Sequence, residues 1–163
     1  MIIAGKFEKV SLDAFRKYVL VPTEKELLDM YNSITLPKRA TTGSAGYDFV
    51  APYEINLNPN QCIVIPTGIR CKIREGWMLG IYPRSGLGFK THVRLANTVG
   101  IIDSDYYHAD NEGHIMVKLV TDSEHPLHVA KGDRFCQGIF TQFGVVEDDY
   151  TDAERTGGMG STD

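Results

Sequence analysis

The sequence predicts a mainly β protein, arranged as an antiparallel sandwich or barrel, with a short helical segment before it and a glycine-rich arm after it. The main observation lies after Leu36, where short runs rich in β-branched and aromatic residues are separated by Gly and Pro. The length of 163 residues also suits one domain with a sizeable core. The expected strands are 61–65, 69–73, 77–82, 98–102, 114–120 and 135–143.

The two ends of the chain differ from this β pattern. Thr23 precedes an acidic turn and an apolar stripe that begins at Leu27, as an N-cap precedes a helix, and Ser11 is a candidate start for a shorter helix. Residues 1–35 are therefore expected to be a helical extension that packs outside the β domain of residues 36–150. Residues 151–163 are polar and rich in Gly, so we expect a mobile arm that buries little surface.

Composition narrows the class of protein. The formal net charge of −4 argues against a sequence-independent grip on polymeric nucleic acid, although one triphosphate needs only a few local cations. The three cysteines, Cys62, Cys71 and Cys136, form no C-x-x-C pair, and each is expected to be a small buried hydrophobe in a reducing cytoplasm. No segment approaches the roughly 20 apolar residues of a membrane span. We expect a cytoplasmic protein.

Two segments carry residue types suited to phosphate chemistry. In YPRSGLGFK (82–90), Arg84, Ser85 and Gly86 offer a bidentate cation and free backbone amides, although a plain turn explains them equally well. In GIIDSDY, Asp103 and Asp105 follow an apolar strand and would share one face if the strand continued. Such a pair could hold a divalent cation or orient a water molecule, and the alternative is a polar turn.

Three further segments are ambiguous alone. The end of the chain, RTGGMGSTD (155–163), resembles a phosphate-wrapping loop but lacks the Lys and the helix of a P-loop. KGDRFCQGIF places Gln137 on a strand, where a buried Gln usually serves the fold. TTGSAGYDFVAP places Gly46 and Asp48 at a strand entry.

Taken together and in order, SAGYDF, PRSGLG, GIIDSDY, GDRFCQ and RTGGMGST resemble the five motifs of the dUTPase family. The resemblance covers roughly residues 36–163. It implies a distorted β jelly roll of the β-clip type, assembled as a homotrimer with three sites at subunit boundaries. It also implies magnesium-dependent hydrolysis of dUTP to dUMP and pyrophosphate, which limits uracil in DNA and supplies dUMP for thymidylate synthesis.

The resemblance also implies roles for individual residues. Asp103 matches the carboxylate that orients and deprotonates the water attacking the α-phosphorus, while Tyr106 matches the tyrosine that packs on deoxyribose. Magnesium is expected on the triphosphate and water, with no direct protein ligand assigned. Asp48 either reaches it through water or holds a subunit contact around Arg84. The other expected substrate contacts are Arg84, Ser85, Gly86, Asn97, Gly100, Ile102, Gln137, Arg155, Met159, Gly160, Ser161 and Thr162.

Two departures from the family pattern stand out. Residues 107–112 insert about five residues between Tyr106 and Gly113, and Met159 stands where the family usually has a Phe over the uracil. The insertion is a candidate site for a protein partner. Two alternatives to dUTP hydrolysis stay open. A dCTP deaminase shares this fold but needs a Glu beside the base, which Glu112 does not match, and a trimeric interaction protein would bind nucleotide without turnover.

Overall fold

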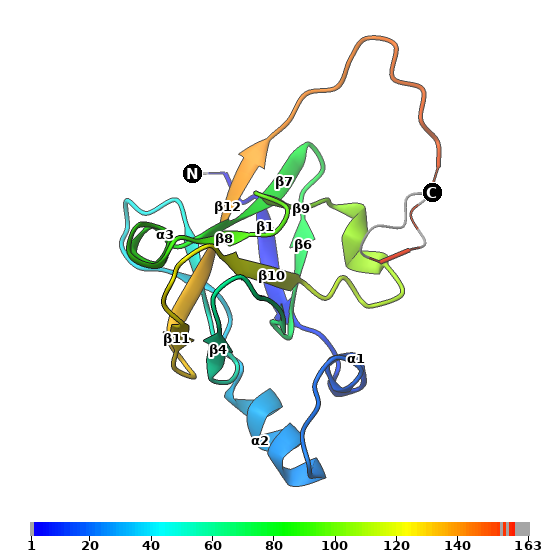
Figure 1. Ribbon diagram of the computed structural model, residues 1–163. Coiled ribbons are helices and arrows are strands. Elements are labelled where there is room, and N and C mark those ends of the chain that lie inside the picture. Colours follow the sequence, from blue (N-terminus) through cyan, green and yellow to red (C-terminus); the bar gives the residue numbers. More distant parts are fainter. Residues whose placement is uncertain (1, 154, 156, 159–163) are drawn as a thin grey trace.

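The computed structural model describes residues 2–153, 155, 157 and 158, and over these residues the strands form four antiparallel sheets (Figure 1). The strands are β1 (Gly5–Lys9), β2 (Lys38–Arg39), β3 (Tyr47–Val50), β4 (Ile55–Leu57), β5 (Cys62–Pro66), β6 (Ile69–Ile73), β7 (Trp77–Pro83), β8 (Val93–Leu95), β9 (Gly100–Ile102), β10 (Met116–Thr121), β11 (Leu127–Val129) and β12 (Arg134–Gln142). The helices are α1 (Leu12–Arg16), α2 (Glu24–Ser33), α3 (Ser85–Thr91) and the 3-10 helix η1 (Asp105–His108).

The five-stranded sheet positions most of the motif residues. Its order is β2-β3-β12-β7-β9, so the nine-residue β12 lies between β3 and β7. Gln137 of β12 is paired with Asp48 on one side and with Tyr82 on the other. The sheet therefore brings together the first, second and fourth motifs, which are far apart along the chain.

The six expected strands are confirmed, each with small shifts at its ends or none. The helical interpretation of the N-terminal stretch is wrong for residues 7–9, which belong to β1 and pair with β6, with Phe7 opposite Cys71. Three local expectations also need correction. Cys71 and Cys136 are buried as expected, but Cys62 is exposed because it lies at the start of β5 with its side chain facing away from the core. The chain leaves β9 at Ile102, so Asp103 and Asp105 do not continue an extended strand, and the expected turn after Pro83 is the short helix α3.

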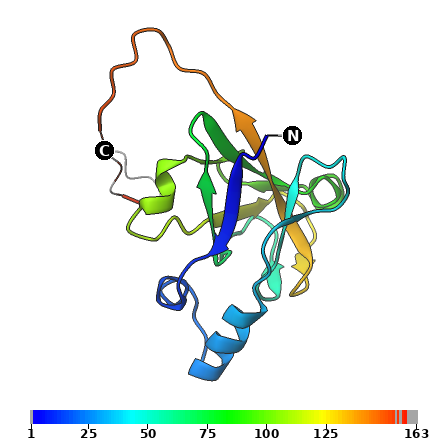
Figure 2. The same cartoon turned by 180° about the vertical axis from the view of Figure 1, so that it is seen from behind.

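The expected N-terminal helices are confirmed, and their caps show why they start where they do. The Ser11 hydroxyl accepts a hydrogen bond from the Ala14 amide at 3.1 Å, and the Thr23 hydroxyl accepts one from the Glu26 amide at 3.2 Å. Both helices lie at one end of the β body (Figures 1 and 2). Phe15 of α1 is fully buried, which joins this end to the core.

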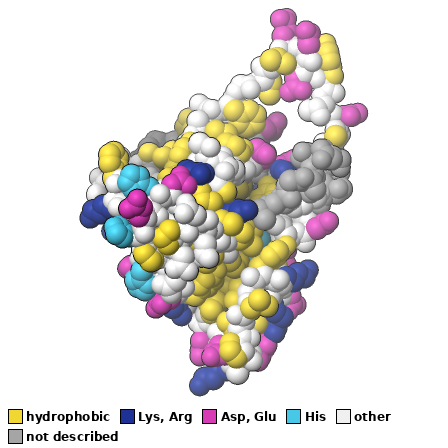
Figure 3. All heavy atoms as spheres, viewed as in Figure 1, with side chains coloured by type: hydrophobic (Ala, Val, Ile, Leu, Met, Phe, Trp, Pro, Cys, Tyr) yellow, Lys and Arg dark blue, Asp and Glu magenta, His cyan; other side chains and the backbone are white. Residues whose placement is uncertain are grey.

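The segment after β12 leaves the β body. Residues 144–153 are all exposed, and Figure 3 shows acidic and apolar side chains on the outer turn of this segment. It returns to the body near η1, where Arg155 is partly buried. None of the described helices combines the length and hydropathy needed to cross a bilayer.

Candidate active site

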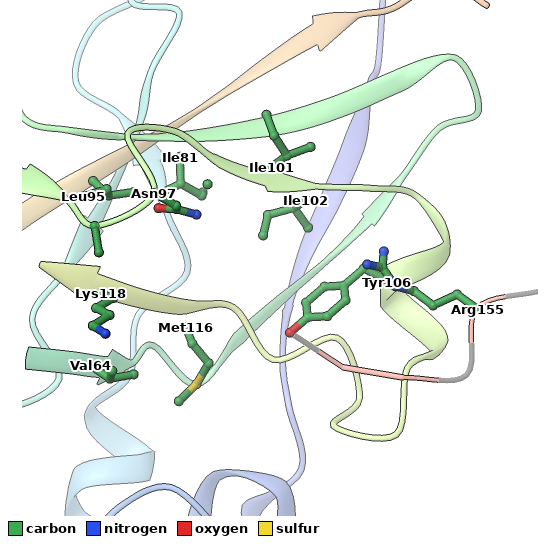
Figure 4. Close-up of a pocket in the computed structure, with 12 residues that line it drawn as sticks. Val64, Ile81, Leu95, Asn97, Ile101, Ile102, Tyr106, Met116, Lys118 and Arg155 are labelled. Atoms are coloured by element: carbon green, nitrogen blue, oxygen red, sulfur yellow. The ribbon is translucent and has the colours of Figure 1, made fainter. Parts of the chain in front are cut away.

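A cavity of about 340 Å³ lies beside β9, bounded by the β8–β9 connection, β10 and η1 (Figure 4). Its wall is mainly aliphatic, with a few polar groups, as is usual for a site that takes a small organic ligand. The predicted substrate-binding residues that line it are Asn97, Gly100, Ile102, Tyr106 and Arg155. Residues from the third and fifth motifs therefore meet at one cavity.

Strand β9 is the edge strand of its sheet, and all three of its residues line the cavity. It pairs with β7 on one side only, with Gly100 opposite Ile81 and Ile102 opposite Leu79. A Cβ on Gly100 would lie 3.3 Å from the Cβ of Ile81, so glycine allows the close approach of the two strands. An edge strand keeps half of its peptide N–H and C=O groups free of ladder bonds. The cavity is thus bordered by peptide donors and acceptors.

Tyr106 forms a fixed wall of this cavity. Its side chain is buried, and its hydroxyl donates to the His114 carbonyl at 2.9 Å and accepts from Asn111 Nδ2 at 2.7 Å. The Arg155 guanidinium lies over the ring, 5.3 Å from its centroid. Burial raises the pKa of the Tyr106 hydroxyl, which therefore stays protonated and acts as a donor.

Asp103 and Asp105 share one cation, although they do not share a strand. Nη1 of Arg155 lies 3.3 Å from an oxygen of Asp103 and 3.1 Å from an oxygen of Asp105. The arginine side chain is only 13% exposed, and its Nε is buried with no hydrogen-bond partner in the described part of the chain. The carboxylates are half exposed, so they remain open to water and to a ligand.

A second cluster forms where β3, β12 and the start of α3 meet. Asp48 pairs with Arg84 at 3.4 Å and with Arg134 at 3.2 Å, and its carboxylate is largely buried. Gln137 Nε2 donates to the Pro83 carbonyl at 3.3 Å. A Cβ on Gly46 would overlap the Gln137 amide oxygen, so glycine is needed to leave that side chain in place. Ser85 and Gly86 are exposed in the first turn of α3, where helix amides lack intrahelical acceptors.

These two clusters lie at opposite ends of β7. Ile102, which precedes Asp103, pairs with Leu79, whereas Arg84 follows Pro83 at the far end of the strand. At about 3.3 Å per residue, five residues of strand separate the clusters by roughly 17 Å. In Figure 1, α3 and the helix that follows β9 lie on opposite sides of the fold. One chain therefore does not assemble all the predicted residues into one site.

Seven of the twelve residues that line the cavity were not expected from the sequence, among them the charged Lys118, and Asn111, which supports Tyr106 from outside the lining, was also missed. Lys118 lines it from β10, where it alternates with the buried Val117 and Leu119, and that alternation was a usable signal. Asn111, which binds the Tyr106 hydroxyl, had no signal because it lies in the insertion. The predicted contacts Met159, Gly160, Ser161 and Thr162 lie outside the described residues. Within the described residues, no three His, Cys, Asp or Glu side chains are grouped to hold a metal ion.

The sequence and the fold are both similar to those of known proteins of one family. The dUTPase family model matches residues 32–162. The deoxyuridine 5'-triphosphate nucleotidohydrolase of Lactococcus lactis subsp. lactis is 40% identical over 132 residues, which cover 79% of this chain and 88% of that protein. The crystal structure of the dUTPase from Streptococcus mutans has a TM-score of 0.67 and 28% identity, and the match covers 86% of this chain and 98% of that one.

The fold is therefore the distorted jelly roll that the resemblance implies. The dUTPase of phage phi11 of S. aureus has the same fold, with a TM-score of 0.59 at 20% identity over 73% of this chain and 90% of that one. That phage structure, of a mutant form of the enzyme, is described as revealing the coordination of a structural Mg(II) ion.

Proposed function

Since the chain belongs to the dUTPase family, we propose that it hydrolyses dUTP to dUMP and pyrophosphate. The observation that carries the proposal is the cavity beside β9, where an open strand edge and the Tyr106 ring line the wall and Asp103, on the same short segment, pairs with the lining residue Arg155. These three groups suit a uracil, a deoxyribose and a phosphate, respectively.

The uracil base binds along the free edge of β9, with Asn97, Gly100 and Ile102 as the contacts. Uracil presents two carbonyl acceptors around an N–H donor, and the peptide groups of an extended strand supply the matching donors and acceptor. Cytosine reverses part of this pattern, and the methyl group of thymine would collide with a close backbone. A mismatched base leaves buried polar groups unpaired, which gives sharp discrimination.

The deoxyribose packs on Tyr106. The ring is held by the hydrogen bonds of its hydroxyl to His114 and Asn111, so it does not yield to a larger sugar. This rigidity is the reason a 2′-hydroxyl is rejected.

Asp103 orients a water molecule for in-line attack on the α-phosphorus and accepts its proton. Its main contribution is to hold the water in line with the α-phosphorus. In the structure its carboxylate pairs with Arg155. When the triphosphate binds, Arg155 moves onto phosphate oxygens and frees Asp103 for the water. Met159, Gly160, Ser161 and Thr162 follow Arg155 over the nucleotide and exclude bulk water.

The triphosphate is bound by the second cluster of a neighbouring subunit in a homotrimer. Support comes from the roughly 17 Å that separates the clusters along β7, which is too far for one chain to complete the site. Ser85 and the Gly86 amide stabilise the leaving oxygen, where negative charge grows, and Gln137 and Arg84 contact the phosphates. Asp48 holds Arg84 in place.

The residues present fit a magnesium ion that arrives with its substrate. Asp48 is paired with two arginines, so its carboxylate would reach a metal only through water, and the metal would be held mainly by the substrate and by water. When bound, Mg²⁺ neutralises the charge that develops on the pyrophosphate leaving group.

The reaction takes place in the cytoplasm, where it limits uracil incorporation into DNA. A protein partner at the 107–112 insertion is an additional proposal, supported by the exposed His108 and Asp110.

The test is pyrophosphate release from dUTP, UTP and the four common dNTPs, with and without magnesium. We expect pyrophosphate release from dUTP but not from UTP or the four common dNTPs, and only in the presence of magnesium. Ammonia from dCTP would favour the deaminase instead. Intact dUTP after hours with magnesium would refute hydrolysis and favour a nucleotide-binding interaction protein.

A further inference from the structure

The N-terminal extension and the 107–112 insertion, neither of which belongs to the family pattern, are bound to each other. The family match begins at residue 32, and the insertion covers residues 107–112. Ser11, which caps α1, donates from its amide to one oxygen of Glu112 at 2.8 Å and from its hydroxyl to the other at 2.6 Å. Both oxygens of the carboxylate are therefore used to join segments 101 residues apart.

A second set of contacts reinforces this one. The Tyr107 hydroxyl donates to Glu8 of β1 at 2.5 Å. Arg70 of β6 lies over the Tyr107 ring, 4.4 Å from its centroid, and pairs with Glu8 at 3.5 Å and with Glu112 at 3.9 Å. We call these five residues, Glu8, Ser11, Arg70, Tyr107 and Glu112, the clasp. It closes the N-terminal segment over the insertion with charge-assisted hydrogen bonds, which are stronger than neutral ones.

The backbone of Glu112 adopts a conformation that is unfavourable for a residue with a side chain. Its φ is +60°, a left-handed conformation that favours Gly, and the next residue, Gly113, has φ +68°. A Cβ on Gly113 would lie 2.7 Å from the Tyr106 carbonyl oxygen, so the end of the insertion packs directly on the backbone of Tyr106. A glycine at 112 would relieve the strain but could not bind Ser11.

The insertion in turn holds the tyrosine of the cavity. Asn111 precedes Glu112 and donates to the Tyr106 hydroxyl at 2.7 Å, while its side-chain oxygen accepts from the Gly113 amide at 3.1 Å. A displacement of Glu112 therefore reaches the Tyr106 ring through Asn111 at its hydroxyl and through Gly113 at its backbone.

We propose that the clasp is a positioning device through which the N-terminal segment fixes Tyr106 and so sets the selectivity of the cavity for deoxyribose over ribose. Ser11 and Glu112 are its main positioning residues. The proposal rests on the proposed function in one respect, namely that Tyr106 contacts the sugar. It gives the extension, which lies outside the family match, a direct effect on nucleotide selection.

The test is the binding preference for dUDP over UDP, measured by titration calorimetry on the full-length protein, with dUTP turnover measured separately. Glu112→Gln keeps the shape and the backbone cost of Glu112 but removes its charge. We expect the preference to fall by about threefold to tenfold. Tyr106→Ala, which removes the wall itself, sets the largest loss that can be observed.

Four further variants make the result specific. In a Ser11→Ala background, which loses the hydroxyl bond but keeps the amide bond of residue 11 and the Arg70 pair, Glu112→Gln should lower the preference by less than it does in the wild type. Ser11→Thr keeps the hydroxyl and should retain the wild-type preference. Asp122→Asn makes the same acid-to-amide change at an exposed ion pair with Arg94, away from the clasp, and should leave the preference unchanged.

A lower thermal midpoint of Glu112→Gln with an unchanged preference would overturn the proposal, since the clasp would then serve the fold alone. A wild-type protein without any preference for dUDP would overturn it as well. A wild-type protein that prefers dUDP but does not hydrolyse dUTP would refute the proposed function and leave the clasp supported by its variants.

Discussion

The most informative perturbation of the fold is a fall in pH acting on His114. The side chain is fully buried, between the rings of Phe15 and Tyr18. Its Nε2 accepts a hydrogen bond from the Gly68 amide at 2.8 Å, so the ring is neutral, with its proton on Nδ1. A second proton would turn that acceptor into a donor facing another donor. Burial lowers the pKa of His114 to about 4, against a weaker opposite effect of Glu112.

The sign and size of the effect follow from proton linkage. The unfolded chain takes up a proton at this residue below pH 6.5, and the folded chain does not until about pH 4. The contribution of His114 to the free energy of unfolding is therefore fully present above pH 6.5, and it is lost as the pH falls from 6.5 to about 4. The difference between 6.5 and about 4, at roughly 1.4 kcal/mol per pH unit, gives a loss of about 3 kcal/mol.

The assay is urea denaturation at one protein concentration, in steps from pH 7 to pH 4, for the wild type and for His114→Gln. Gln can still accept from the Gly68 amide but does not titrate, so its stability should change little between pH 6.5 and 5. Glu8 does not disturb this interval, because its pKa is lowered to about 2 by Lys6 and Tyr107, and its contribution is lost only below pH 4.5. His125→Gln controls for the loss of an exposed histidine.

Two results would refute this reasoning. One is a wild-type stability that does not change between pH 7 and pH 5. The other is a His114→Gln variant that declines as steeply as the wild type, since the decline would then come from other groups.

Three predictions concern the proposed reaction. Asp103→Asn should lower kcat roughly 100- to 10,000-fold in a pyrophosphate-release assay, with the Kd for dUTP from calorimetry nearly unchanged, because the water loses its orienting charge; an active variant would contradict the assigned role. Truncation after Ala153 should nearly abolish turnover while dUMP still binds, and normal rates would show that the arm is not used. Gly46→Ala should displace the Gln137 amide and raise the KM for dUTP roughly tenfold, the effect of one hydrogen bond to a charged group. Its thermal midpoint should stay near the wild-type value, and a large drop would show that Gly46 serves the fold instead.

Sequence reasoning succeeded where the information was local. The strand 69–73 alternates buried residues with less buried ones, and Thr23 has the acidic turn that follows an N-cap. Strand β1 was missed because only Phe7 is buried among its five residues, and its identity depends on pairing with β6, far along the chain. Helix α3 was missed because Gly86 and Gly88 are poor helix formers.

The residues of the site likewise were predicted where the information is local in the sequence and missed where it depends on distant contacts. Asn97, Gly100, Ile102 and Tyr106 lie near one another in sequence, and they do meet at one cavity. Asn111 could not be predicted, because its task depends on the path of the insertion between Tyr106 and Gly113. A sequence motif identifies the residues of a site. It does not give the path of an insertion, because that path depends on contacts with distant parts of the chain.

The separation of the two clusters along β7 has a consequence for mixed assemblies. If each catalytic centre combines the cavity of one subunit with the phosphate-binding cluster of a neighbouring subunit, a chain with a substitution in one cluster still supplies an intact copy of the other. Asp103→Asn and Ser85→Ala proteins, each inactive alone, should complement each other when they are unfolded and reassembled together. Some centres in the mixed trimers would then contain both an unsubstituted Asp103 and an unsubstituted Ser85. The mixture should therefore hydrolyse dUTP faster than either variant alone.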